Sequence, residues 1–304
     1  MQKMANDFYP AAAAASAVRT LTLALTDPQQ QREVSLRVHI PDADGPHPVV
    51  VFSHGALCSP AAYDRITTHW ASRGYAVIVV GHMDAPENPP PAGPPDLQKL
   101  LSSRIRDLSF ALDAVAQIEA AAGAANLFDL QRVGAAGHSF GAVGALVKVG
   151  LLLKSGEYLL VGSPADARFS AAISLSGVGP LPPMADDAFA TLTGPLLATG
   201  GSLDEGNVGA GPVFPWEWRL SPYTLAPEGD KFSLALRDGD HYLGGLIANE
   251  KLGGEADTLG LAAVAAVTTA FLDAYLRGDD AAAAWLRDTD LAGLTEGRAQ
   301  FDRK

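Results

Sequence analysis

The feature that most constrains this chain is a glycine-flanked serine motif, Gly137-His138-Ser139-Phe140-Gly141. An apolar run at residues 132–136 precedes it, and a helix-like stretch at residues 142–147 follows it. This order is typical of a nucleophile elbow, a sharp turn between a strand and a helix. Glycines flank the serine because a Cβ would crowd such a turn, and the serine itself is forced towards backbone angles that it tolerates only under constraint. We therefore predict that a strand and a helix meet at Ser139.

The length and charge of the chain narrow its class. With 304 residues it can bury a substantial core, and 48% of its residues are hydrophobic. No uninterrupted apolar run approaches the ~18 residues of a membrane span, so we expect no membrane insertion. Acidic residues outnumber basic ones by 34 to 22, which opposes binding to nucleic acid or anionic lipid. A neutral small molecule is the expected partner. The single cysteine, Cys58, excludes an intramolecular disulfide.

The N-terminal region contains an alanine run at residues 11–15, which could resemble the apolar part of a signal peptide. Asp7 and Pro10 interrupt the approach to it. We therefore predict a flexible leader at residues 1–18 and a single domain at residues 19–304. A cytoplasmic location is expected, or a secreted or periplasmic one if a signal peptide has been removed.

Strand and helix signals alternate along the chain, and no repeat interrupts them. The first two strands alternate apolar and polar residues, as an antiparallel pair at a sheet edge does, whereas helical crossovers join the others. The predicted fold class is α/β, with a mostly parallel eight-stranded sheet and helices on both faces. The predicted strands are residues 20–25, 34–40, 48–52, 75–80, 132–136, 171–177, 195–200 and 231–237, and the predicted helices are residues 60–73, 97–115, 142–147, 257–278 and 281–286.

Two further motifs follow the serine motif. An acid follows a late strand in Gly201-Ser202-Leu203-Asp204, and a histidine follows the last strand in Asp238-Gly239-Asp240-His241. With this order of serine, acid and histidine, the chain resembles the α/β-hydrolase superfamily from about residue 21 to residue 275. Phe52-Ser53-His54-Gly55 adds a likeness to dienelactone-hydrolase-like and platelet-activating-factor-acetylhydrolase-like serine esterases. True dienelactone hydrolases differ in using a cysteine nucleophile, and the acetylhydrolases carry their acid one strand earlier.

The resemblance implies a catalytic triad within a single α/β-hydrolase catalytic domain. Ser139 would be the nucleophile, His241 the group that takes and returns its proton, and Asp204 the acid that orients the imidazole. Asp240 is expected to shape the histidine loop instead. Other acids could replace Asp204 in its role: Glu205, Asp186 and Asp187.

An oxyanion hole needs two backbone N–H donors. Phe140, after the nucleophile, would supply one, and Ala56, in the loop after the third strand, would supply the other. Leu57 lies within one position of the same role. His54 and His138 are expected to hold their loops through hydrogen bonds.

Candidate substrate contacts lie in three places. Leu57 borders the oxyanion loop, and His82 ends the fourth strand, where a fully hydrogen-bonded structural histidine is the alternative. Trp216 and Trp218 could form an apolar rim near the triad, or could instead pack their loop onto the body. Substrate choice is expected to depend on the loops at residues 86–95 and 214–218.

No metal or nucleotide motif occurs, so no cofactor and no metal are expected. The predicted function is a serine carboxylic-ester hydrolase that acts through an acyl-enzyme. Because residues 151–168 are too few for an independent lid domain, short to medium or aromatic esters are the expected substrates. A thioesterase or amidase with the same triad and a non-catalytic binding protein of this fold remain alternatives.

Overall fold

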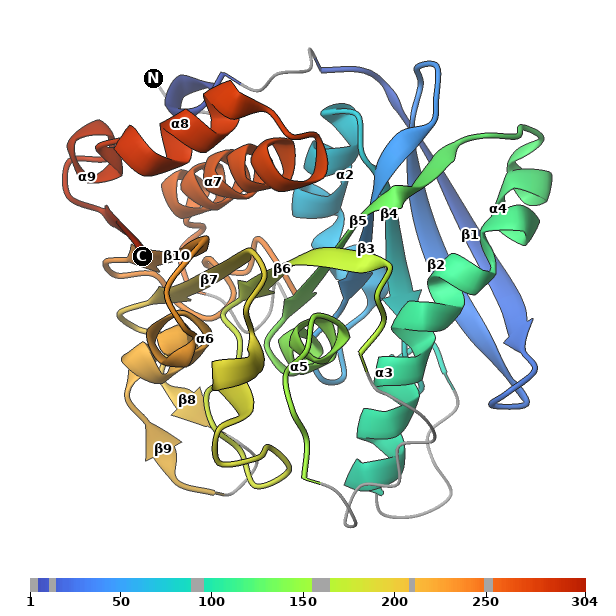
Figure 1. Cartoon of the computed structure of the whole chain (residues 1–304), viewed down its shortest axis with the longest axis horizontal. Helices are drawn as coiled ribbons and strands as arrows, with labels where there is room; N and C mark the ends of the chain where they lie inside the picture. Colours follow the sequence, from blue (N-terminus) through green and yellow to red (C-terminus); the bar gives the residue numbers. More distant parts are fainter. Residues whose placement is uncertain (1–4, 11–14, 89–95, 155–164, 208–210, 249–253) are drawn as a thin grey trace.

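A mixed sheet of nine strands forms the centre of the molecule, and helices cover both of its faces (Figure 1). The computed structural model describes residues 5–10, 15–88, 96–154, 165–207, 211–248 and 254–304. The order across the sheet is β1-β2-β4-β3-β5-β6-β7-β10-β11. Its strands are β1 (Val18–Asp27), β2 (Arg32–Pro41), β3 (His47–Ser53), β4 (Ala76–Gly81), β5 (Phe128–His138), β6 (Phe169–Leu175), β7 (Leu196–Gly201), β10 (Lys231–Leu236) and β11 (Ala299–Arg303).

The strand directions confirm the mostly parallel arrangement. Strands β4, β3, β5, β6, β7 and β10 run parallel to one another, whereas the pairs β1–β2, β2–β4 and β10–β11 are antiparallel. The parallel strands are buried along nearly their whole length because helices cover both faces. All eight predicted strands are present.

The ninth strand, β11, was not predicted. It pairs antiparallel with β10, and its Phe301 stacks on Phe232 with ring centroids 5.8 Å apart. The segment is short and mostly polar, so it has no strand-like pattern of its own. Only the exposed edge of β10 makes it a strand.

Helices on one face are α1 (Ala5–Phe8), α2 (Asp64–Ser72), α7 (Thr258–Leu276) and α8 (Asp280–Asp288), and those on the other are α3 (Leu97–Asp113), α4 (Val115–Ala122) and α5 (Phe140–Lys148). Shorter elements complete the described chain: α6 (Ser221–Leu225), α9 (Leu291–Leu294), three 3₁₀ helices at Pro60–Tyr63, Ala188–Thr191 and Trp216–Leu220, and a small hairpin of β8 (Gly206–Asn207) and β9 (Val213–Phe214). The side chains of Ser59 and Asp257 cap the helices that follow them by accepting hydrogen bonds from Ala61 N–H and Gly260 N–H.

Helix α7 is mostly apolar, and its few polar side chains are largely buried. Its length and composition would allow it to cross a membrane, but 83% of its most apolar window is buried inside the domain. It packs against the sheet, α2 and α8, which explains why it lacks a polar face.

Part of the segment predicted as a flexible leader packs onto α7. Phe8 and Tyr9 are buried, and Tyr9 Oη donates a hydrogen bond to Asp273 Oδ2 at 2.9 Å. The buried carboxylate and the apolar surface around it fix residues 5–10, which no local pattern could indicate. Residues 1–4 and 11–14 of the predicted leader lie outside the described residues.

The parallel strands determine where the site forms. Since β5, β7 and β10 run in one direction, their carboxyl ends lie at the same edge of the sheet. Ser139, Asp204 and His241 all follow these ends. The fold therefore brings the three predicted residues to one edge.

Candidate active site

The backbone at Ser139 has the strained geometry expected of an elbow. Its φ is 54° and its ψ is −125°, values that a non-glycine residue rarely adopts. Ser139 N–H donates to Leu175 O at 3.0 Å, which ties the turn to β6. A Cβ on Gly141 would lie 2.1 Å from Ser53 O, and a Cβ on Gly137 would lie 2.4 Å from Gly141 O. Both glycines are therefore required by close backbone approach, as predicted.

The predicted acid and base are hydrogen-bonded to each other. His241 Nδ1 donates to Asp204 Oδ1 at 2.8 Å, which leaves Nε2 as the ring nitrogen that can accept a proton. Burial opposes ionisation of Asp204, but the hydrogen bond from His241 and the charges of His241 and Arg219 outweigh it. Together they hold the pKa of this carboxyl below its usual value. Asp204 is therefore an anion at neutral pH.

Contacts with His138 place His241 beside the elbow. The two imidazole rings lie 4.6 Å apart between centroids, and His138 Nε2 donates to His241 O at 2.9 Å. Because His138 precedes Ser139 directly, these contacts bring His241 to the residue adjacent to the predicted nucleophile.

The alternative acids do not reach this position. The side chain of Asp186 is fully exposed and lies 3.7 Å from Lys154, and Asp187 is exposed as well. Glu205 is exposed, and it is its backbone carbonyl that accepts a hydrogen bond, from Arg219. Of the four carboxylates considered from the sequence, only Asp204 bonds to His241.

Arg219 is a site residue that the sequence did not reveal. It is buried and donates Nε–H to Asp204 Oδ1 at 2.9 Å, Nη1 to Gly177 O at 3.0 Å and Nη2 to Glu205 O at 3.1 Å. The guanidinium thus joins the acid to the loop after β6. Arg219 lies in the 3₁₀ helix at Trp216–Leu220, within the irregular segment between β7 and β10. No sequence motif indicates that its side chain contacts Asp204.

The loop after β3, residues 54–58, faces the elbow and is called here the β3 loop. Gly55 N–H donates to Tyr63 Oη at 2.9 Å, and Leu57 N–H donates to Asp84 Oδ2 at 3.0 Å. Between them, the N–H of Ala56 makes no hydrogen bond within the described part of the chain. Phe140 is the first residue of α5, so its N–H has no partner inside that helix. These are the two donors that the sequence predicted for an oxyanion hole.

Two buried histidines support these loops, as predicted. His54 Nδ1 donates to Gly55 O at 2.6 Å, and its Nε2 accepts from His82 N–H at 3.0 Å. His138 Nδ1 accepts from Tyr63 Oη at 2.9 Å. Burial is the main cause that lowers the pKa of His138 to about 3 and that of His54 well below its usual value, so both rings are neutral.

Asp240 shapes the loop that carries His241, as predicted. Its Oδ1 accepts from the N–H groups of Tyr242 and Gly244, and its Oδ2 accepts from Gly254 N–H. With these three bonds the carboxylate organises the backbone of its own loop.

Two of the candidate substrate contacts prove to be structural. His82 is fully buried, with Nε2 bonded to Ser53 Oγ at 2.7 Å and Nδ1 bonded to Asp107 Oδ2 at 2.8 Å, so its ring faces no substrate. Trp218 is 8% exposed and stacks on Phe214 with centroids 4.7 Å apart. Trp218 therefore packs the segment at residues 214–218 against the rest of the domain.

The other two candidates remain accessible. Leu57 is 76% exposed at the tip of the β3 loop, and Trp216 is half-buried. Of the two loops expected to govern substrate choice, residues 89–95 lie outside the described part of the chain.

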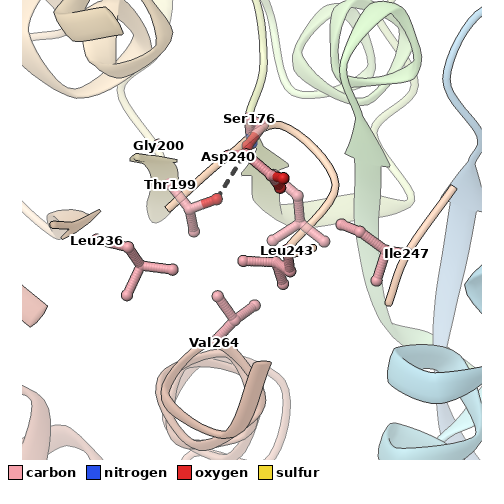
Figure 2. A pocket seen from close by; sticks show the side chains of 9 residues that line it. Ser176, Thr199, Gly200, Leu236, Asp240, Leu243, Ile247 and Val264 are labelled. Atoms are coloured by element: carbon pink, nitrogen blue, oxygen red, sulfur yellow. Dashed lines mark hydrogen bonds between the residues drawn. The ribbon is translucent and has the colours of Figure 1, made fainter. Parts of the chain in front are cut away.

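A small cavity lies behind the histidine loop (Figure 2). Apolar side chains of Leu236, Leu243, Ile247 and Val264 point into it, with Ser176 and Thr199 at its polar end. Its volume is about 10 Å³, roughly the space of one water molecule, so it cannot accept an acyl chain.

The described residues contain no group of three or more His, Cys, Asp or Glu side chains placed to hold a metal ion.

The fold and the elbow define the chain as an α/β-hydrolase. A chlorophyllase family model matches residues 12–179, more than half of the sequence, and this family lies within the α/β-hydrolase superfamily. The chain belongs to the chlorophyllase family and is a hydrolase of the ester-hydrolysing, carboxylesterase type. No curated protein sequence matches it significantly. The matched region includes Ser139 but ends before Asp204 and His241, and membership of the dienelactone-hydrolase-like or acetylhydrolase-like branches remains a prediction.

Proposed function

We propose that the chain is a serine carboxylic-ester hydrolase that works through an acyl-enzyme. The observation that carries the proposal is the 2.8 Å hydrogen bond from His241 Nδ1 to Asp204 Oδ1, beside a serine held at positive φ. The bond fixes the tautomer whose free Nε2 can accept a proton. An ordinary serine in a strand-to-helix turn requires neither the strain nor a buried acid–histidine pair.

In the proposed reaction, Ser139 Oγ attacks the ester carbonyl carbon while its proton passes to His241 Nε2. The carbonyl oxygen becomes an oxyanion, which the N–H groups of Ala56 and Phe140 stabilise. The bond from carbon to the alcohol oxygen then breaks, and the proton moves from His241 to the leaving alkoxide. A water molecule attacks the acyl-enzyme by the same steps in reverse and releases the acid and free Ser139.

A fluorophosphonate probe tests the nucleophile directly. Wild-type protein should be labelled, and Ser139→Ala should lose both the label and ester turnover. The matched control is Ser170→Ala, which removes a hydroxyl from the opposite end of β6 and should leave labelling unchanged. Unlabelled wild-type protein would favour the alternative, a non-catalytic binding protein of this fold.

A panel of substrates is needed to identify the preferred acyl and leaving groups, because the triad determines that an acyl group is transferred but not which acyl group or leaving group is used. We propose short to medium or aromatic esters, since residues 151–168 are too few for an independent lid domain and since Leu57 and Trp216 are accessible for apolar contacts. The panel should compare tributyrin and smaller esters with triolein, and should include thioesters, amides and, after the family's name, chlorophyll. A clear preference for triolein would reject the proposed size class, and faster turnover of thioesters or amides would favour those activities.

A further inference from the structure

Arg104 is a buried cation that the proposed reaction does not use. It lies in the middle of α3 and is 1% exposed, yet its guanidinium reaches the β3 loop. Its nitrogen atoms contact His54, Gly55 and Asp84, and its ring partner is Phe140. One side chain therefore touches both segments that carry the proposed oxyanion donors.

The carbonyl contacts of Arg104 orient the peptide that carries Ala56 N–H. Nη1 donates to His54 O at 2.7 Å, and Nη2 donates to Gly55 O at 3.1 Å. In a planar trans peptide, the C=O of one residue and the N–H of the next point in opposite directions. Since Gly55 O points towards Arg104, Ala56 N–H must point away from it.

Asp84 holds the next peptide of the β3 loop, the one between Ala56 and Leu57. Its Oδ2 accepts Leu57 N–H at 3.0 Å and Arg104 Nη2 at 2.7 Å, while its Oδ1 accepts Arg104 Nε at 3.0 Å. Leu57 has a φ of 57°, so the loop turns sharply at this residue. With Leu57 N–H bonded to Asp84, Ala56 is left as the donor from this loop. Burial opposes the charge of Asp84, but Arg104 outweighs it and lowers the pKa of Asp84 to about 2.

Arg104 also contacts the elbow. Its guanidinium carbon lies 5.0 Å from the centroid of the Phe140 ring, within the range of a cation–π interaction. Close packing of Gly141 against the backbone of Ser53 and His54 adds a second link between the elbow and the β3 loop. Arg104 and its carboxylate thus contribute, together with this packing and the bond from His54 Nδ1 to Gly55 O, to the relative position of the two donors.

We propose that Arg104 and Asp84 are positioning residues that set the oxyanion hole, with Ala56 and not Leu57 as its donor from the β3 loop. The inference rests on the proposed function. Arginine suits this role because its planar fork makes four hydrogen bonds here, to two carbonyls and to both oxygens of Asp84, whereas a lysine has only three N–H donors on one atom.

The test compares Arg104→Lys and Asp84→Asn with Arg106→Lys. Arg106 lies on the same helix and is paired with Asp27 and Asp113, away from the β3 loop, so it is a matched control. For each variant, kcat and KM on a soluble ester, the inhibition constant of an aryl trifluoromethyl ketone and the Tm should be measured. The ketone forms a tetrahedral adduct with Ser139 that carries an oxyanion.

Both site variants should lower kcat by about 10- to 100-fold, since loss of a whole oxyanion donor costs about 10²- to 10³-fold. KM should change little, and the inhibitor should weaken in parallel with kcat/KM. Because both residues act on one loop, the double variant should lose less than the product of the single effects. Arg106→Lys should retain wild-type kcat and inhibition.

Folded site variants that keep wild-type kcat and inhibition would overturn the proposal, and so would failure of both to fold, since the pair would then be structural. Failure of the proposed function is a separate result: wild-type protein would show neither fluorophosphonate labelling nor ester turnover. The inference fails alone when the wild type is active and the two site variants match it.

Discussion

Arg219 and His241 donate hydrogen bonds to the same oxygen of Asp204, at 2.9 Å and 2.8 Å. Arg219 balances the charge of the acid and also holds the carbonyls of Gly177 and Glu205. The oxygen of Asp204 that bonds to His241 is therefore also held by a buried cation.

Replacing Arg219 by methionine should destabilise the protein by about 3 kcal/mol, because a buried carboxylate loses its cation and two carbonyls lose a donor. Arg237→Met is the control, since its ion pair with Asp238 is exposed and 3.7 Å long, and its loss should cost at most about 1 kcal/mol. Urea unfolding at pH 7 measures both values. Equal losses in the two variants would contradict the structural role of Arg219.

Asp204→Asn should lower kcat by about 10³- to 10⁴-fold while the protein stays folded, because an amide can stabilise the wrong imidazole tautomer and cannot stabilise its charged form. Asp186→Asn, at a fully exposed side chain, should match the wild type. Steady-state kinetics on one soluble ester, with circular dichroism to check the fold, decide the comparison. Near-normal kcat in Asp204→Asn would remove this residue from the proposed triad.

Gly141→Ala should prevent normal folding of the elbow, since its Cβ would lie 2.1 Å from Ser53 O and neither backbone can yield. We expect a loss of more than about 4 kcal/mol or insoluble protein. Gly123→Ala is the control: its φ is 66° but nothing lies within 4 Å of the new Cβ, so only about 1 kcal/mol of strain is expected. Thermal unfolding compares the two, and a mild effect at Gly141 would contradict the close approach.

Buried neutral histidines should make the fold sensitive to acid. Burial lowers the pKa of His39 and His69 to about 4 and that of His138 to about 3. The unfolded chain binds protons at these histidines more readily than the folded protein does. Their contribution to the free energy of unfolding is therefore fully present above about pH 6.5 and is lost as the pH drops towards 4. Asp107 acts in the opposite direction, since burial raises its pKa to about 6 and its contribution is lost as the pH rises from about 4 to 6.

The contribution of one histidine can be isolated with His69→Gln, which can keep a hydrogen bond to Thr269 but cannot be protonated. The difference in unfolding free energy between pH 7 and pH 4.5 should be smaller in the variant by about 1–2 kcal/mol. Urea unfolding at both pH values measures it. An unchanged difference would show that His69 is not protonated on unfolding.

The sequence determined the central sheet and the elbow, because both depend on signals within a few residues of each other. Apolar runs covered by helices indicate inner parallel strands, and the glycines around Ser139 indicate a turn with no room for a Cβ. The order of Asp204 and His241 after late strands follows from the same local pattern. Parallel strands then bring these residues to one edge without any further information.

Only the tertiary structure decided how the site is supported. The bonds from Arg219 to Asp204 and from Arg104 to Gly55 join residues 15 and 49 positions apart through irregular loops, where spacing carries no period. The same holds for β11, which is a strand only because β10 offers it an edge, and for His82, whose burial depends on the helix that packs over it. Local patterns specify which elements form, but long-range burial and hydrogen bonding determine which polar groups are already engaged and which remain available for chemistry.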